Sequence, residues 1–210
     1  MNSIRIENFI YPYVRFLNAS FSIEGADFYV GNSLASPRLG FGCFSGYVKV
    51  PAGNVEIRVK SAADKEKIID TVTLPFKPGS VYTVAVVNAD GSPMLYGISE
   101  PTQRDNVNCN HLRVCHLTPF LKNLDVNANG YKILGDIDYL EISKYMCLLP
   151  GKYEFSVFDT KSGSSKLVMP NQNLEKGKYN TLYVVGNDLE KTPLMGLLSV
   201  DAASYTGYYL

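Results

Sequence analysis

The sequence predicts an all-β protein built of two tandem immunoglobulin-like antiparallel β-sandwich domains. Two observations favour this fold: short segments of alternating apolar and polar residues recur along the chain, and the whole pattern returns after 98 residues. The 210 residues include fifteen Tyr, ten Phe and no Trp, and Tyr and Phe are enriched in pleated, half-buried strands. A chain of this length is typical of two domains of ordinary size.

The repeat is clearest where residues 41–59, FGCFSGYVKVPAGNVEIRV, are compared with residues 139–157, YLEISKYMCLLPGKYEFSV. Apolar residues alternate on both sides of Pro51-Ala52-Gly53, which predicts a strand, a turn and a second strand, interpreted as a hairpin around this turn. One register holds over some seventy residues, so we infer a duplicated domain. Identical residues 98 positions apart include Tyr47 and Tyr145, Gly53 and Gly151, Glu56 and Glu154, Val59 and Val157, and Asp27 and Asp125.

Each repeat contains about seven short strand patterns separated by turn residues, and no helical pattern of ten or more residues. In the first repeat the expected strands are 13–20, 26–30, 47–50, 55–59, 69–74, 82–87 and 94–99. The predicted domain organisation is a lead-in strand at 1–12, a sandwich at 13–100, a polar linker at 101–110, a second sandwich at 111–201 and a Tyr-rich tail at 202–210.

Composition excludes several classes of protein. Twenty basic residues balance twenty acidic ones, so no net charge attracts nucleic acid or an anionic membrane. The longest apolar runs fall far short of the roughly 20 residues that span a bilayer. The N-terminal residues show no basic segment followed by an apolar one, so no signal peptide is expected.

Four cysteines are too few for a disulfide scaffold in a chain this long. Cys109 and Cys115 lie six residues apart on one expected strand, about 20 Å at roughly 3.3 Å per residue, so they cannot bridge to each other. We therefore expect mostly free thiols, with a pairing of Cys43 or an intermolecular link left open.

Cys109, His111, Cys115 and His116 are the one cluster with zinc-like residue types. A strand places His116 on the face opposite to the other three, so no metal is predicted. A structural role, in which His116 ties the end of the first strand to a neighbouring turn, is the favoured interpretation.

Two pairs of acids have the residue types of general acid–base catalysis. Asp27 and Asp125 each begin a strand, where Asp commonly binds a turn, and Asp136 with Asp138 is interpreted as solvated. No catalytic residue and no cofactor is therefore predicted.

Several motifs together resemble the DUF4397 family. In the first repeat these are Val-Arg-Phe-x-Asn-Ala-Ser at 14–20, Ala-Asp-Phe-Tyr-Val at 26–30, Leu-x-Phe-Gly at 39–42, Ser-x-Tyr at 45–47, Val-Pro-Ala-Gly at 50–53 and Gly-x-x-Tyr-Thr-Val at 79–84. The second repeat keeps diverged versions of them. The resemblance implies a surface-associated immunoglobulin-like module of bacterial extracellular proteins, often in tandem, without established catalytic activity.

We therefore expect a non-enzymatic structural or adhesive protein of a cell envelope, spore coat or appendage, located at a cell or spore surface; a cytoplasmic location is the alternative. It would assemble with itself or with another surface protein or glycan through sandwich edges and chain ends. The alternative function is a carbohydrate- or protein-binding module that uses exposed Tyr and end loops. The candidate interaction residues are Ile4, Ile6, Phe9, Tyr205, Tyr208 and Tyr209.

Overall fold

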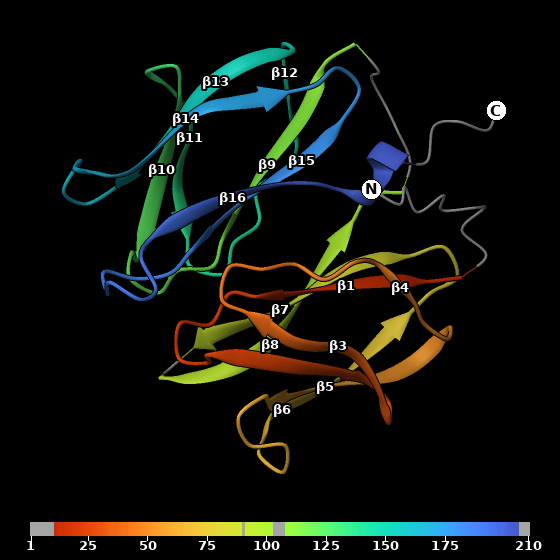
Figure 1. Cartoon of the computed structure of the whole chain (residues 1–210). Helices are drawn as coiled ribbons and strands as arrows, with labels where there is room; N and C mark the ends of the chain where they lie inside the picture. The colour runs from red at the N-terminus through yellow and green to blue at the C-terminus, as the bar shows by residue number, and fades with distance from the viewer. Residues whose placement is uncertain (1–10, 90, 103–107, 206–210) are drawn as a thin grey trace. The chain divides into compact units, whose positions relative to one another are not determined.

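The computed structural model describes residues 11–89, 91–102 and 108–205, and the chain divides into two compact domains, of which the second comprises residues 104–204. The predicted fold class is confirmed, because each domain is a sandwich of two four-stranded sheets. Figure 1 shows the two layers within each domain.

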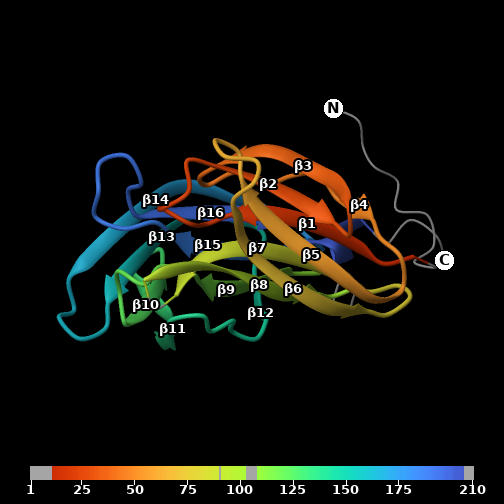
Figure 2. The same ribbon diagram turned by 90° about the horizontal axis from the view of Figure 1, so that it is seen from below.

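The first domain has eight strands, one more than the sequence indicated. One sheet has the order β4-β1-β7-β8 and the other the order β3-β2-β5-β6; Figure 2 shows that strands of both sheets run in similar directions. The strands are β1 Tyr13–Asn18, β2 Gly25–Val30, β3 Ser33–Gly40, β4 Val48–Lys49, β5 Gly53–Ser61, β6 Ile68–Phe76, β7 Val81–Ala89 and β8 Ser92–Glu100.

The second domain repeats this topology with sheets β12-β9-β15-β16 and β11-β10-β13-β14. Its strands are β9 Asn110–His116, β10 Asn123–Ala128, β11 Tyr131–Asp138, β12 Met146–Leu148, β13 Gly151–Asp159, β14 Ser165–Leu174, β15 Tyr179–Val185 and β16 Met195–Val200. A short 3-10 turn, Ala202–Tyr205, follows β16.

One pairing in each domain departs from a purely antiparallel sandwich. β1 lies parallel to β7, and β9 lies parallel to β15. Between the two members of each pair the chain crosses to the opposite sheet and back twice, because β4 or β12 lies in the same sheet as the pair. This is the long connection that parallel neighbours require.

The segment that first reveals the repeat is not a hairpin, which corrects the sequence-based interpretation. β4 pairs with β1, whereas β5 pairs with β2 and β6 in the other sheet. Pro51-Ala52-Gly53 therefore carries the chain from one sheet to the other. Gly53 has a φ of 110°, which only glycine adopts without strain.

The core of each domain lies between its two sheets, where alternation along each strand supplies two facing apolar layers. In the first domain the rings of Phe16 and Phe28 stack there with centroids 4.7 Å apart. Val14, Ile57 and Val84 are fully buried beside them. The corresponding buried positions of the second domain are Leu112, Val114, Val126, Phe155 and Leu182.

No helix in the described part of the chain is long and apolar enough to cross a membrane. The lead-in residues Ile4, Ile6 and Phe9, and the tail residues Tyr208 and Tyr209, lie outside the described residues.

Candidate functional site

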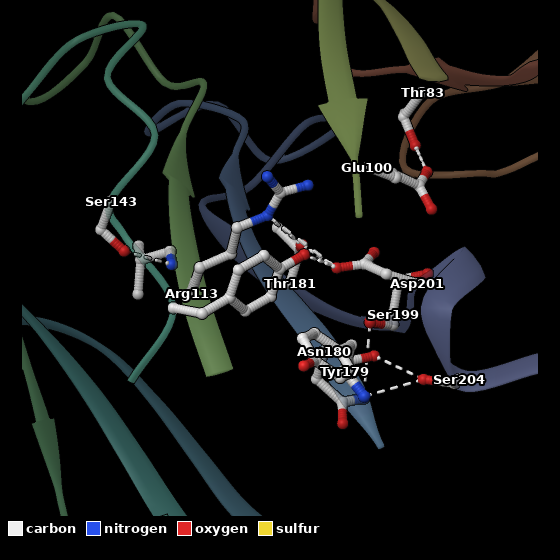
Figure 3. A network of polar contacts seen from close by, with 12 residues as sticks. Thr83, Glu100, Arg113, Ser143, Tyr179, Asn180, Thr181, Ser199, Asp201 and Ser204 are labelled. Atoms are coloured by element: carbon white, nitrogen blue, oxygen red, sulfur yellow. Dashed lines mark hydrogen bonds and ion pairs between the residues drawn. The ribbon is translucent and has the colours of Figure 1, made fainter. Parts of the chain in front are cut away.

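A network of four polar side chains, three of them buried and one half-buried, stands out in the second domain (Figure 3). Arg113 of β9 donates from Nε to the Thr181 hydroxyl of β15 at 2.8 Å, and Thr181 in turn donates to the carboxylate of Asp201. The Tyr145 hydroxyl donates to the same carboxylate, and the Arg113 guanidinium lies 4.7 Å from the centre of the Tyr145 ring. We call Arg113, Tyr145, Thr181 and Asp201 the second quartet.

The first domain contains the same arrangement. Arg15 donates from Nε to the Thr83 hydroxyl at 2.7 Å, and the hydroxyls of Thr83 and Tyr47 both donate to the carboxylate of Glu100. Arg15 Nε lies 3.1 Å from Glu100 Oε1. We call Arg15, Tyr47, Thr83 and Glu100 the first quartet.

The acidic side chain is a glutamate, Glu100, in the first quartet and the shorter aspartate Asp201 in the second. Arg113 Nε lies 3.9 Å from Asp201 Oδ2, farther than the 3.1 Å between Arg15 and Glu100, as expected for a side chain shorter by one methylene. In both domains the arginine and the acid are buried. Each buried arginine thus has a hydroxyl acceptor and an opposite charge close to it, and each buried carboxylate accepts from two hydroxyls, which is the condition for tolerating these charges inside a fold.

The contacts of the second quartet hold parts of the second domain together. Burial and the charge of Asp201 raise the pKa of the Tyr145 hydroxyl, so the phenol keeps its proton and donates it to the Asp201 carboxylate. Hydrogen bonds from Thr181 and Tyr145 hold the Asp201 carboxylate as an acceptor. The quartet fixes β9, β15 and the segment around Tyr145 to one another.

The Ser-x-Tyr motif acquires a physical explanation from these contacts. Ser143 accepts a hydrogen bond from the Val114 N–H, and Ser45 accepts one from the Phe16 N–H. Two residues later, the tyrosine of each motif enters its quartet. The motif therefore attaches the segment before β12 or β4 to the first strand of its domain.

His116 has the structural role that the sequence predicted. Its Nε2 lies 3.0 Å from the Leu121 carbonyl oxygen, and its Nδ1 accepts from the Thr118 N–H. Burial lowers the pKa of His116 to about 4, so the imidazole is neutral at neutral pH. In the first domain Asn18 makes the equivalent contacts, with the Ile23 carbonyl and the Ser20 N–H.

Asp27 and Asp125 also bind the backbone, as expected for acids at strand starts. Asp27 accepts from the N–H of Arg38, and Asp125 accepts from the N–H of Asp136. Both donors belong to residues with positive φ, 48° and 55°, where the edge strands β3 and β11 bulge. Asp136 thus contributes its backbone to the bulge, and Asp138 accepts from the Asn123 amide.

The expectation of mostly free thiols is wrong for two of the four cysteines. Cys109 and Cys147 form a disulfide with their Cα atoms 5.6 Å apart. Cys43 and Cys115 are free, the first exposed and the second buried, and burial raises the pKa of the Cys115 thiol. The disulfide joins the start of the second domain to β12, because β12 pairs with β9 rather than with β13.

The first domain has a different contact at the equivalent place. Tyr11 and Lys49 lie 98 residues before Cys109 and Cys147, and Lys49 Nζ is 3.0 Å from the centre of the Tyr11 ring. One position therefore carries a cation–π contact in the first domain and a covalent bond in the second.

The structure does not arrange Cys109, His111, Cys115 and His116 as a metal site. Cys109 belongs to the disulfide, and its sulfur lies 3.7 Å from Nε2 of His111, which stacks on the Tyr179 ring. Among the residues that the structure describes, no three His, Cys, Asp or Glu side chains are placed to hold a metal ion.

Exposed aromatic and aliphatic side chains are the other candidates for binding. Tyr205, predicted from the tail, is 45% exposed. The two most exposed large hydrophobic side chains described, Tyr131 at 79% and Leu149 at 76%, were not predicted. Both flank turns of the second domain, and the first domain has Ser33 and Pro51 at the equivalent positions. These two differences between the repeats, seen when residues 98 positions apart are compared, are the sequence signal that could have identified Tyr131 and Leu149.

A family model described as a domain of unknown function, DUF4397, matches residues 12–125 and again residues 110–206. The chain belongs to this family. The two matches agree with the tandem arrangement of the DUF4397 domains, and the quartets, the Ser-x-Tyr contacts and the bulge acids are the features that the two copies share.

Two solved structures were found at low similarity to this DUF4397 chain. One is a carbohydrate-binding module of family CBM26 from Eubacterium rectale Amy13K in complex with maltoheptaose: 12% identity, TM-score 0.27, covering 90% of this chain and 95% of that one. The other is a putative adhesin from Bacteroides ovatus: 8% identity, TM-score 0.25, covering 90% and 91%. No curated protein matches the chain.

Proposed function

We propose that this DUF4397 protein is a non-catalytic structural or adhesive component of a bacterial surface, such as the cell envelope, a spore coat or an appendage. It assembles with copies of itself through sandwich edges and chain ends. The observation that carries the proposal is the use of the buried polar side chains: both quartets, His116 and the bulge acids bind groups of their own domain. Such groups stabilise a scaffold, and they are not arranged around a reacting molecule.

The Cys109–Cys147 disulfide supports a location outside the cytoplasm. Disulfides persist in oxidising compartments and at cell surfaces, whereas cytosolic reductants keep thiols reduced. A surface component also benefits from a covalent link that limits opening of the domain.

Electron microscopy of the purified full chain over a concentration series tests this function. We expect filaments or larger oligomers that increase with concentration, and we expect deletion of residues 1–12, which carry Ile4, Ile6 and Phe9, to abolish them. A matched deletion of residues 206–210 tests Tyr208 and Tyr209 in the same way. Unchanged light scattering after both deletions contradicts assembly through the chain ends.

A second candidate function is binding of a carbohydrate or protein by the end loops of the second domain. It is favoured by Tyr131 and Leu149, the two most exposed large hydrophobic side chains described, because exposed aromatics offer binding area at low entropic cost. Glycan-array binding that is lost in Tyr131→Ala, in a chain that forms no filaments, would favour this candidate over assembly.

A further inference from the structure

The two sulfur atoms of the Cys109–Cys147 disulfide lie in different surroundings. Cys109 directly precedes β9 and is only 3% exposed, whereas Cys147 belongs to β12 and is exposed. Thiol–disulfide exchange begins with attack of a thiolate on one of the two sulfur atoms, and access helps to decide which one is attacked. A thiolate from outside the domain therefore reaches Cys147, and Cys109 is then the leaving group.

The leaving sulfur has a hydrogen-bond donor beside it. Nε2 of His111 lies 3.7 Å from Cys109 Sγ. Because a sulfur atom in a disulfide carries no hydrogen, the imidazole is the donor in this contact and Nε2 carries a proton. Exchange leaves negative charge on the departing sulfur, and a buried charge is unfavourable unless a donor meets it. The Nε2–H group of His111 is placed to meet the charge on Cys109.

The imidazole is held in this position by its neighbours. His111 is itself buried, and its ring stacks on the ring of Tyr179 with centroids 4.1 Å apart and planes inclined by 7°. The Tyr145 ring packs edge-on against Tyr179, and the Tyr179 N–H donates to the Ser204 hydroxyl. The donor therefore stands in place before any reaction begins.

The donor accompanies the disulfide when the two domains are compared. Both domains pair the first strand with the same partner strand in the same register. The first domain has no histidine, and its only cysteine is Cys43. Its residues at the positions of Cys109, Cys147, His111 and Tyr179 are Tyr11, Lys49, Tyr13 and Val81.

Exchange at Cys147 does not require the domain to unfold, because other contacts hold β12. All three residues of this strand are in register with β9. Tyr145, just before the strand, donates to the Asp201 carboxylate of the second quartet. These contacts remain when the S–S bond opens.

We propose that the Cys109–Cys147 disulfide is a site of thiol–disulfide exchange in the folded domain, which accepts a thiolate at Cys147 and releases Cys109 toward the Nε2–H group of His111. The bond between the two cysteine sulfurs breaks and its electron pair stays on Cys109 Sγ, while the incoming sulfur bonds to Cys147. One disulfide replaces another, so the step needs no oxidant. The site goes beyond the proposed function, because it gives the second domain a point of covalent attachment for thiols.

The fate of the mixed disulfide depends on the incoming compound. With a monothiol, the Cys109 thiolate returns to Cys147 and expels the compound, so the attachment is reversible. With a dithiol, the second thiolate attacks the sulfur already bound to Cys147, which leaves as a thiolate. The dithiol is then oxidised by two electrons, the protein disulfide is reduced, and both cysteines take protons from solvent.

The incoming thiolate comes from a small molecule or from a second copy of the chain, and the chemistry is the same. Cys43 is an exposed free thiol of the first domain, and its attack on Cys147 of a second copy joins two chains. Cys115 is a free but buried thiol. It is therefore the matched control for Cys43.

Mass spectrometry of the native full chain tests the direction of attack. The protein is incubated with excess glutathione at neutral pH, quenched in acid to stop further exchange, and digested with pepsin. We expect adducts that carry glutathione on Cys147 and a free thiol at Cys109. Glutathione mainly on Cys109, or equally on both cysteines, overturns the proposal. A rate that rises steeply in low urea also overturns it, since exchange would then require unfolding.

Variants of His111 test the donor through the rate at which dithiothreitol reduces the disulfide. His111→Phe keeps a ring that stacks on Tyr179 but has no N–H group, and we expect reduction about tenfold slower than in the wild type. His111→Gln has an amide donor and should restore part of the rate. Circular dichroism shows that both variants are folded. Equal rates in the wild type and folded His111→Phe, or the same slow rate in both variants, overturn the proposal.

Non-reducing electrophoresis of the concentrated protein identifies the source of the thiolate. Cross-linked chains that are lost in Cys43→Ser and kept in Cys115→Ser support exchange with a second copy. Glutathione adducts without cross-linked chains support exchange with a small-molecule thiol. The absence of both products overturns the proposal.

Discussion

Removal of the Cys109–Cys147 disulfide is the perturbation whose size the structure predicts best. The double variant Cys109→Ser with Cys147→Ser removes the covalent link and introduces two small polar side chains. The bond closes a loop with a sequence separation of 38 residues. For a loop of that length, the chain-entropy model gives a loss of about 4 kcal/mol in the free energy of unfolding of the second domain.

The first domain provides a matched exchange. Cys109→Tyr with Cys147→Lys places the pair found at Tyr11 and Lys49 into the second domain. A cation–π contact at a half-exposed site contributes about 0.5–1 kcal/mol. We therefore expect this variant to recover only a minor part of the loss.

Hydrogen exchange read by mass spectrometry reports on each domain separately. A loss of about 4 kcal/mol corresponds to exchange of the most protected amides of β9 and β15 that is roughly a thousandfold faster, while β1 and β7 remain unchanged. Thiol titration of the unfolded, unreduced wild type should detect only Cys43 and Cys115. Four reactive thiols, or equal protection in wild type and double variant, would refute the reasoning.

The remaining predictions concern contacts that both domains share. Because the pKa of His116 is lowered to about 4 from an unfolded value of about 6.5, its contribution to stability is complete above pH 6.5. It falls by about 3 kcal/mol as the pH decreases to 4, and urea unfolding of His116→Asn, which mimics Asn18, should lack this component. Asp27→Ala leaves the Arg38 N–H without its acceptor, so exchange of that amide should accelerate, at a cost of about 1–3 kcal/mol. Tyr145→Phe removes a hydrogen bond to a buried carboxylate and should lower the free energy of unfolding by about 1.5–3 kcal/mol.

The fold class could be predicted from the sequence because the two copies of the domain show the same strand and turn pattern independently. Apolar alternation and the turn glycines recur at 98 residues, and both copies form the predicted sandwich. Arg15 and Arg113 recur at the same spacing on otherwise apolar strands, which was a signal for the quartets. Their acids are separated by 101 residues instead, since the chain that links paired positions of β15 and β16 is three residues longer than the chain between the same positions of β7 and β8. Counting in a fixed register therefore could not match Glu100 with Asp201.

The disulfide was missed for a topological reason. Apolar alternation around Pro150-Gly151 is the same for a hairpin and for a crossover between sheets, because both contain two strands and a turn. As a hairpin, it places Cys147 beside β13, far from Cys109. Only the pairing of β12 with β9 brings the two sulfur atoms together.

Two differences between the domains, the disulfide of the second and the Asp70 contact of the first, both affect how easily a domain opens. In the first domain the Asp70 carboxylate accepts from the Leu95 N–H and so links β6 to β8, whereas the register of the second domain places Leu167 at that position. A domain that partly unfolds is an aggregation hazard, because unpaired strand backbone becomes accessible. A disulfide in that same domain makes such opening less frequent. The Cys109–Cys147 disulfide thus restrains the domain that lacks the Asp70 contact, whereas the first domain has the noncovalent Tyr11–Lys49 contact at the equivalent place.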